Sequence, residues 1–232
     1  MIKISFSWDD GSIYDIKLAN LMMKYNIQAM FFIPNTNWEQ PYIKQKEIKE
    51  LFDMGMEIGG HTVSHKYLTT IPKENIENEI KDNKAYLEDI IGNNVDIFCY
   101  PGGFYNEYIE NLVKKYYKRA RSAKTLRFNI QNSFTMDTTF HFYNRGVKSI
   151  LKNTFQNDKK ELLTILKSFR FDTFEYYKQI LLNLDKHKDC NIHIWGHGWE
   201  IEKYRLWDKL ENFIKFLKDN DFRIISNSEM YL

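Results

Sequence analysis

The sequence has little of what marks several common protein classes. Its 232 residues include only two cysteines, Cys99 and Cys190, which lie far apart and form no C-x-x-C pair. Neither a disulfide framework nor a thiolate zinc site is therefore expected, and both cysteines should be small buried side chains. A formal net charge of only +2, from 33 basic and 31 acidic residues, predicts neither nucleic acid nor an anionic membrane as a partner.

Long apolar runs are absent as well. No stretch approaches the roughly 20 apolar residues of a membrane-spanning helix, so no transmembrane segment is expected. The opening residues, MIKISF, read as a strand and lack the apolar region and cleavage site of a signal peptide. We therefore expect a cytoplasmic protein from the sequence as it stands, and an extracytoplasmic one if a leader has been removed.

The chain does contain enough apolar residues, 43% of the total, to bury one sizeable core, and a single domain over residues 1–232 is expected. Strand-like and helical segments alternate along it, which favours a mostly parallel sheet with outer helices, closed or nearly closed into a barrel. Strands are expected from the N-terminus to Trp8 and near 28–33, 56–59, 96–100, 119–123, 191–195 and 222–225. Helices are expected near 14–25, 45–54, 73–91, 106–117, 158–169, 173–187 and 206–220. The aromatic-rich residues 127–150 fit no pattern, and a loop or an insertion is expected there.

Polar side chains follow several of these strands. Asp9 and Asp10 end the first strand in SFSWDDGS, His61 and His65 follow the third in GGHTVSH, and His197 ends a late strand in NIHIWGHGWE. In parallel barrels the chemistry lies at the carboxyl ends of the strands, so these side chains should lie together. A plain turn is the alternative for the first motif, because Asp-Gly is a common turn dipeptide.

The spacing of His61 and His65 suits a metal. Histidines four residues apart share one face of a helical turn, and one added carboxylate completes a three-ligand site with an open position. Alone, this spacing is also common among surface and capping histidines. The Asp-Asp-Gly stretch at an earlier strand end favours the metal.

Taken together, the motifs resemble those of the polysaccharide deacetylases, carbohydrate esterase family 4 or the NodB-homology domain. SWDDG resembles the family's T-F-D-D-G motif, HTVSH its H-[ST]-x-x-H motif, YPGG its third motif and IHIWGHGWE its late histidine motif, in the same order over residues 4 to about 200. The resemblance implies an α/β fold, a distorted (β/α) barrel of about seven parallel strands with outer helices. It also implies metal-dependent removal of N- or O-acetyl groups from amino sugars and related glycans.

The resemblance further implies a role for each motif residue. Asp9 would be the general base, and Asp10, His61 and His65 would hold a divalent metal, with zinc expected and Co²⁺, Ni²⁺ or Mn²⁺ as alternatives. His197 would be the general acid that protonates the leaving amine. Dividing the aspartate pair in this way agrees with electrostatics, since a cation keeps its own aspartate ionised and favours ionisation of the neighbour.

Residues around these motifs have expected roles too. Gly102, after Pro101, matches the family's backbone N–H that stabilises the oxyanion, and a simple turn is the alternative. Trp195 and Trp199 are expected either to line the acetyl pocket or stack on a sugar ring, or to be core tryptophans. His193, deeper in the same strand, is expected to be a core or supporting histidine.

Two features of the family are missing from their usual places. The third motif often begins with an arginine that pairs with the general base, and Cys99 stands there; Arg121 or Arg145 is expected to substitute. The acid that orients the late histidine belongs to a fourth motif that is not recognisable here. Asp137 and Glu200 are the two candidates.

The leading hypothesis is a divalent-metal-dependent deacetylase that acts on an N-acetylated carbohydrate, and the expected partner is a carbohydrate or another small acylated substrate. A hydrolase of non-sugar amides on the same fold and a catalytically silent glycan-binding protein are the alternatives. The silent alternative predicts loss of Asp9 or His197, and both are present.

Overall fold

The computed structural model describes residues 2–128, 133–146, 149, 152, 161–185 and 189–230. Within them, eight strands form one sheet in the order β5-β4-β3-β2-β1-β7-β6, with β8 paired to β1. All the strand pairings are parallel. The strands are β1 (Ile2–Asp9), β2 (Met30–Ile33), β3 (Glu57–Gly60), β4 (Ile97–Cys99), β5 (Arg119–Arg121), β6 (Phe140–His141), β7 (Cys190–His197) and β8 (Arg223–Ile224).

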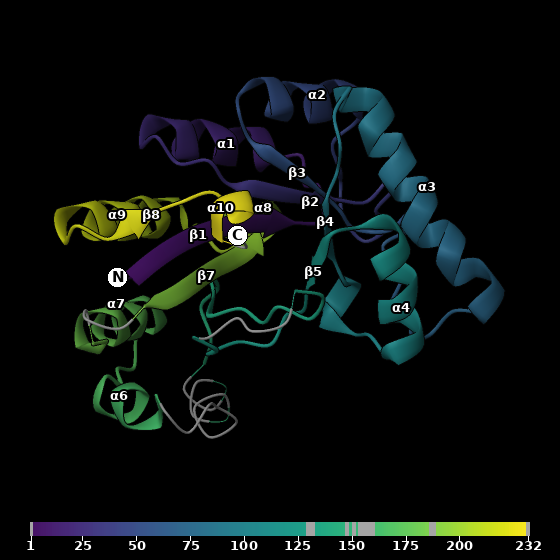
Figure 1. The fold of residues 1–232 in the computed structure, drawn as a ribbon. Coiled ribbons are helices and arrows are strands. Elements are labelled where there is room, and N and C mark those ends of the chain that lie inside the picture. The colour runs from purple at the N-terminus through teal and green to yellow at the C-terminus, as the bar shows by residue number, and fades with distance from the viewer. Residues whose placement is uncertain are drawn as a thin grey trace.

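Helices follow the strands and lie around the outside of the curved sheet (Figure 1). They are α1 (Asp15–Lys24), α2 (Gln45–Asp53), α3 (Lys73–Ile91), α4 (Glu107–Tyr116), α6 (Leu162–Lys167), α7 (Thr173–Asn183), α8 (Gly198–Lys203), α9 (Trp207–Asp219) and α10 (Asn227–Met230). This arrangement confirms the predicted distorted (β/α) barrel. None of the described helices is both long enough and apolar enough to cross a bilayer.

The central strand β1 sorts its side chains between two faces by simple alternation. One face packs in the main core with Ile4, Phe6 and Trp8. The other face carries Ser5, Ser7 and Asp9. The hydroxyl groups of Ser5 and Ser7 hydrogen-bond the two ring nitrogens of His193 at 2.8 and 2.9 Å. His193 is therefore the buried histidine that its place in the strand predicts, and burial lowers its pKa well below the usual value.

The segment 127–150 contains a strand that the sequence did not reveal. β6 pairs with β7, and Met136 bridges to Arg121 of β5, so this segment contacts both edges of the sheet. Two backbone bonds mark the two contacts, Ser122 N to Met136 O at 2.7 Å and Thr139 N to His193 O at 2.8 Å. A two-residue strand is too short to show an alternating pattern. Residues 129–132, 147–148 and 150–151 lie outside the described part of the chain.

Other differences concern the ends of helices. α6 begins at Leu162, whereas the sequence predicted a start near 158, and 158–160 lie outside the described residues. α7 ends at Asn183 instead of 187, and 186–188 also lie outside the described residues. The helices α8 and α10, of six and four residues, were not predicted because they are too short to give a helical period.

Candidate active site

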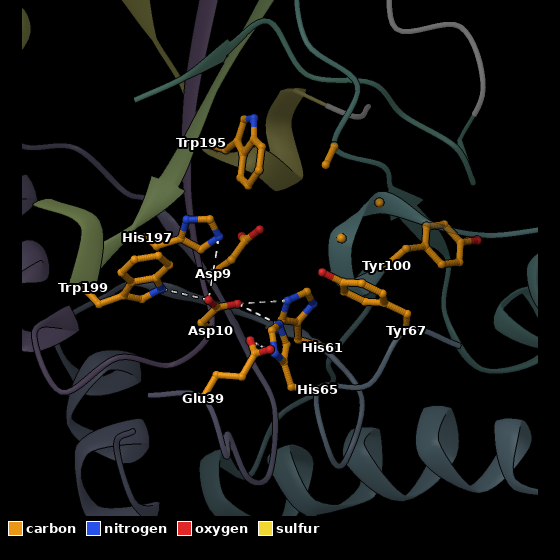
Figure 2. A pocket seen from close by; sticks show the side chains of 13 residues that line it. Asp9, Asp10, Glu39, His61, His65, Tyr67, Tyr100, Trp195, His197 and Trp199 are labelled. Atoms are coloured by element: carbon orange, nitrogen blue, oxygen red, sulfur yellow. Dashed lines mark hydrogen bonds and ion pairs between the residues drawn. The ribbon is translucent and has the colours of Figure 1, made fainter. Parts of the chain in front are cut away.

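A pocket of about 230 Å³ opens at the carboxyl ends of the strands. Its lining includes all the motif residues that the sequence placed at strand ends, namely Asp9, Asp10, His61, His65 and His197. Figure 2 shows these side chains gathered around Asp10. Asp9 and His197 end β1 and β7, Asp10 follows β1, and His61 and His65 lie in the loop after β3. Because β3, β2, β1 and β7 are parallel neighbours in the sheet, their carboxyl ends bring these residues together.

Three side chains each point a possible metal-binding atom toward the others, namely those of Asp10, His61 and His65. Asp10 Oδ1 lies 2.9 Å from His65 Nε2 and 3.5 Å from His61 Nε2 (Figure 2). His61 Nδ1 lies 2.8 Å from the carbonyl oxygen of Cys99. A carbonyl can only accept, so Nδ1 carries a proton, and Nε2 is the ring nitrogen that faces the Asp10 carboxylate. Two imidazoles and one carboxylate directed at the same place form a donor set that fits a divalent ion such as zinc.

The backbone that carries these ligands is unusual. His61 and His65 lie in a loop and not in the helical turn that was considered for their spacing, although their ring centroids still approach to 5.0 Å. Asp10, Thr62 and His65 have φ angles of 79°, 68° and 57°. Residues other than glycine rarely adopt this left-handed region, and such strained positions cluster at functional sites. The loop is anchored by Asn83, whose side-chain oxygen accepts the His61 N–H at 2.8 Å.

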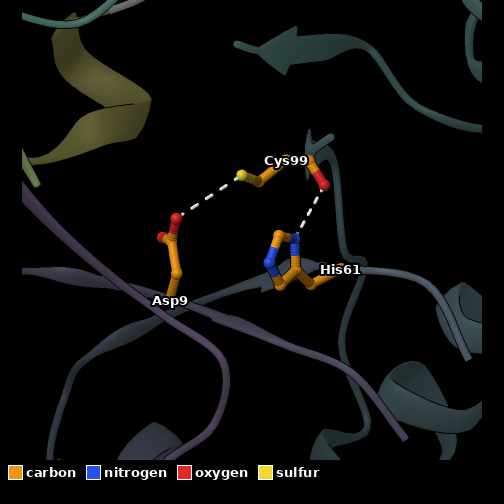
Figure 3. A group of neighbouring side chains, drawn as sticks. All are labelled: Asp9, His61 and Cys99. Atoms are coloured by element: carbon orange, nitrogen blue, oxygen red, sulfur yellow. Dashed lines mark hydrogen bonds between the residues drawn. The ribbon is translucent and has the colours of Figure 1, made fainter. Parts of the chain in front are cut away.

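Asp9 is held by a cation from a different strand than the family motif led us to expect. Arg121 of β5 forms an ion pair with Asp9, and the two side chains are 0% and 4% exposed. The guanidinium lies between the rings of Phe32 and Trp195, 4.8 and 5.1 Å from their centroids. Cys99 is the register partner of Arg121 on β4, and its Sγ lies 3.7 Å from Asp9 Oδ2 (Figure 3). Arg121 therefore contacts the carboxylate that the usual third-motif arginine would contact.

The thiol of Cys99 is neutral in this environment. Burial raises its pKa well above the usual value, which outweighs the opposing effect of Arg121. Cys190 is also buried, as predicted, and burial raises its pKa to about 12.

Arg145 and Asp137 do not take the roles considered for them. Arg145 hydrogen-bonds Nδ1 of His141 at 2.9 Å instead of pairing with Asp9. Asp137 accepts a hydrogen bond from the Ser122 hydroxyl at 2.6 Å and lies 3.7 Å from Arg127, so it does not orient His197. Its place on the β5 side of the sheet is set by the bridge at neighbouring Met136, which no local sequence pattern encodes.

Glu200 is the acid that contacts the late histidine. Its Oε2 lies 2.6 Å from Nδ1 of His197 and 2.7 Å from Nε2 of His141. The sequence analysis missed His141, because it belongs to the irregular segment and no motif surrounds it. The only available signal was that it is one of six histidines in the chain.

The charges around the pocket determine its protonation. Burial opposes ionisation of Asp10, but His197 and the two other histidines outweigh burial and hold its pKa well below the usual value. Burial also opposes the charge on His197, yet Asp10 and Glu200 raise its pKa to about 9. For Glu200, hydrogen bonds from His141 and His197 overcome burial and lower the pKa to about 2. At neutral pH, Asp10 and Glu200 are therefore anionic and His197 is cationic.

The third-motif turn and the tryptophans complete the lining. Gly102 has φ of 62°, and a Cβ at this position would lie 2.8 Å from the Tyr67 ring, so the turn requires glycine. Pro101, just before it, is buried. Trp199 lines the pocket and donates its Nε1–H to Asp10 Oδ2 at 2.9 Å, while Trp195 lines the pocket and is only 7% exposed. Trp195 is thus both a buried residue and part of the wall.

Comparison with known proteins agrees with this geometry. The family model described as polysaccharide deacetylase matches residues 2–120, just over half of the 232-residue chain. The chain belongs to the polysaccharide deacetylase family. The match covers the strands and loops that carry Asp9, Asp10, His61, His65 and Gly102.

Individual polysaccharide deacetylases resemble the chain to different extents. A peptidoglycan-N-acetylglucosamine deacetylase of Bacillus cereus is 29% identical over 168 residues, which cover 70% of this chain and 71% of that protein. A chitin deacetylase of Pestalotiopsis sp. is 28% identical over 89 residues, 38% of this chain and 30% of that protein. The structure of a family 4 acetyl xylan esterase from Clostridium thermocellum, with a cobalt ion, aligns at a TM-score of 0.63 and 16% identity over 99% of this chain and 90% of that chain. These names specify three different polymers, so family membership alone does not select the substrate.

Proposed function

We propose that this chain is a divalent-metal-dependent deacetylase that acts on an acetylated carbohydrate, in the first place an N-acetylated one. The observation that carries the proposal is the convergence of a three-ligand donor set and two further ionisable groups in one pocket. Asp10, His61 and His65 supply the donors, and Asp9 and His197 are the ionisable groups.

The metal would be held by Asp10, His61 and His65. Two imidazoles and one carboxylate with a further position open are typical of catalytic zinc, so zinc is the proposed ion, with Co²⁺, Ni²⁺ and Mn²⁺ as alternatives. When bound, such a cation polarises the acyl carbonyl and lowers the pKa of water. The cobalt ion in the acetyl xylan esterase structure supports the choice of a divalent ion.

Proton transfer would be divided between Asp9 and His197. The attacking water loses a proton during hydrolysis, and Asp9 would accept it while Arg121 fixes the orientation of the carboxylate. The leaving nitrogen or oxygen gains a proton, and His197, whose Nδ1 lies 2.6 Å from the Glu200 carboxylate, would donate it. The backbone N–H at Gly102 would hydrogen-bond the oxyanion that forms on the acyl group.

The pocket wall supports a sugar as the acyl carrier. Aromatic rings of Tyr67, Trp195 and Trp199 line a space of about 230 Å³, which is large enough for an acetyl group and part of one ring. Aromatic side chains offer an apolar face together with a polar atom, a combination that suits the alternating surface of a pyranose.

An acetate-release screen tests the proposal. Zinc-loaded protein would be incubated with chitooligosaccharides, peptidoglycan fragments, acetylated xylan and nucleotide-linked N-acetyl sugars, and the matched control is the same protein treated with a chelator. We expect acetate from at least one substrate, loss of the activity on chelation and recovery when zinc is added back. No release from any substrate by protein shown to contain zinc would reject the proposal and favour a non-sugar amide hydrolase or a silent glycan-binding protein.

A further inference from the structure

A hydrogen-bond network of four side chains leads from the surface of the barrel to His197. Arg145 Nη2 lies 2.9 Å from His141 Nδ1, and His141 Nε2 lies 2.7 Å from Glu200 Oε2. The same Glu200 oxygen lies 2.6 Å from His197 Nδ1. This network joins β6 and the loop after it to α8 and the end of β7. The segment 127–150, which showed no sequence pattern, therefore supports the pocket.

Arg145 fixes the order of donors and acceptors along this hydrogen-bond network. A guanidinium can only donate hydrogen bonds, so Nδ1 of His141 must accept, and the proton of neutral His141 must lie on Nε2. Burial, with a smaller contribution from the nearby cations, lowers the pKa of His141 to about 4, which keeps the ring neutral. His141 Nε2–H then donates to Glu200. The remaining donor to that oxygen is Nδ1–H of His197, and this leaves Nε2 of His197 directed toward Asp10 Oδ2 at 3.8 Å.

The position of His141 is held by packing as well as by hydrogen bonds. Its ring stacks on Trp195 with centroids 4.1 Å apart and planes 14° apart, and it meets the edge of His197 at 5.4 Å. His141 is also the register partner of Trp195 in the β6–β7 pairing. Glu200 and His197 alone are three residues apart on one short segment, where the carboxylate could rotate away. His141, which comes from a neighbouring strand, fixes the carboxylate from a second direction.

We propose that Arg145 and His141 are positioning residues that act through Glu200 to hold His197 with Nδ1 protonated and Nε2 facing the pocket. The inference rests on the proposed function, because it assigns their effect to the step in which His197 donates a proton. Neither side chain need touch the substrate. Their loss should therefore lower kcat and leave KM nearly unchanged.

The test compares His141→Gln with His141→Leu. A glutamine amide can both accept from Arg145 and donate to Glu200, whereas leucine can do neither. We expect His141→Leu and Arg145→Met to lower kcat for acetate release by about 10- to 100-fold, as is usual for residues that orient functional groups from outside the first layer. We expect His141→Gln to stay within about threefold of wild type. Ser168→Ala is the matched control, since it removes a buried hydroxyl that is bonded to Thr164 O at 2.6 Å and does not line the pocket, and kcat should not change.

A proton NMR measurement separates this inference from the proposed function. The Nδ1 proton of His197 in its 2.6 Å bond should give a downfield imidazole resonance, identified by its absence in His197→Gln. The resonance should persist in His141→Gln and broaden or vanish in His141→Leu. If wild type releases no acetate from any substrate but shows this pattern of resonances, the proposed function is wrong and the hydrogen-bond network that positions His197 is confirmed. An unchanged resonance and an unchanged kcat in folded His141→Leu would overturn the inference, as would equal losses of kcat in the leucine and glutamine variants.

Discussion

Replacing Arg121 with methionine should reveal how strongly the buried ion pair supports the site. The Arg121 side chain is 0% exposed and that of Asp9 is 4% exposed, so removal of the cation leaves a carboxylate without its charge partner in the barrel interior. Breaking a buried pair in this way typically lowers the free energy of unfolding by about 3–5 kcal/mol. Arg223→Met is the matched control, because its partner Glu229 and Arg223 itself are 43% and 50% exposed, and such surface pairs contribute about 1 kcal/mol or less. Urea titration measures both values.

A second variant tests whether the cation can come from the neighbouring strand. Cys99 and Arg121 are register partners, and Cys99 Sγ already lies 3.7 Å from the Asp9 carboxylate. We expect Arg121→Ala to reduce acetate release by about 100-fold or more, in line with the loss of a positioned general base, and Cys99→Arg/Arg121→Ala to recover at least about tenfold. Cys99→Arg alone should destabilise the protein, since it buries two guanidinium groups side by side. An Arg121→Met protein with wild-type stability and turnover, or a double variant no better than Arg121→Ala, would refute the reasoning.

Three further predictions concern other parts of the site. Asp10→Asn should weaken zinc binding by at least about 10- to 100-fold, and a wild-type metal content by elemental analysis would contradict this. Gly102 and Gly92 both have left-handed backbones, with φ of 62° and 67°. A Cβ added at Gly102 would lie 2.8 Å from the Tyr67 ring, whereas a Cβ added at Gly92 would have nothing within 4 Å. Gly92→Ala should lower the free energy of unfolding by about 1–2 kcal/mol and leave acetate release unchanged. Gly102→Ala should lower the free energy of unfolding further and reduce acetate release. Equal effects of the two variants would show that the close contact at Gly102 is unimportant. Burial raises the pKa of Asp15 well above its usual value, so stability is lost as pH rises toward that pKa. Asp15→Asn should therefore raise the Tm more at about pH 8 than at about pH 4, and calorimetry showing the same gain at both would contradict this.

The predictable part of the site lies on long, regular elements. β1 and β7 are each eight residues, and their alternation places Asp9 and His197 at strand ends that are adjacent in register. The conclusion that their side chains meet follows from the rule that parallel strands in a barrel end together. His61 and His65 also reach the pocket, although through a loop with positive φ angles instead of the helical turn that their spacing suggested.

The part that could not be predicted depends on short strands and on contacts across the sheet. The sequence offered Arg121 and Arg145 as the cation for Asp9, but the choice between them depends on the register of the three-residue β5 with β4, which no local pattern encodes. His141 lies on the two-residue β6, so neither its strand nor its contact with Glu200 has a periodic signal. His141 became recognisable as a site residue only when the pairing of β6 with β7 placed it beside Glu200 and His197.

The most direct test of the central claim compares zinc-loaded wild type with Asp9→Asn on the substrate that the screen identifies. Elemental analysis and acetate release would be measured on the same samples, with circular dichroism to establish that both proteins are folded. The account predicts about one zinc per chain in both proteins and acetate release from the wild type alone. Equal turnover by Asp9→Asn, or release of acetate by wild type that contains no metal, would contradict it.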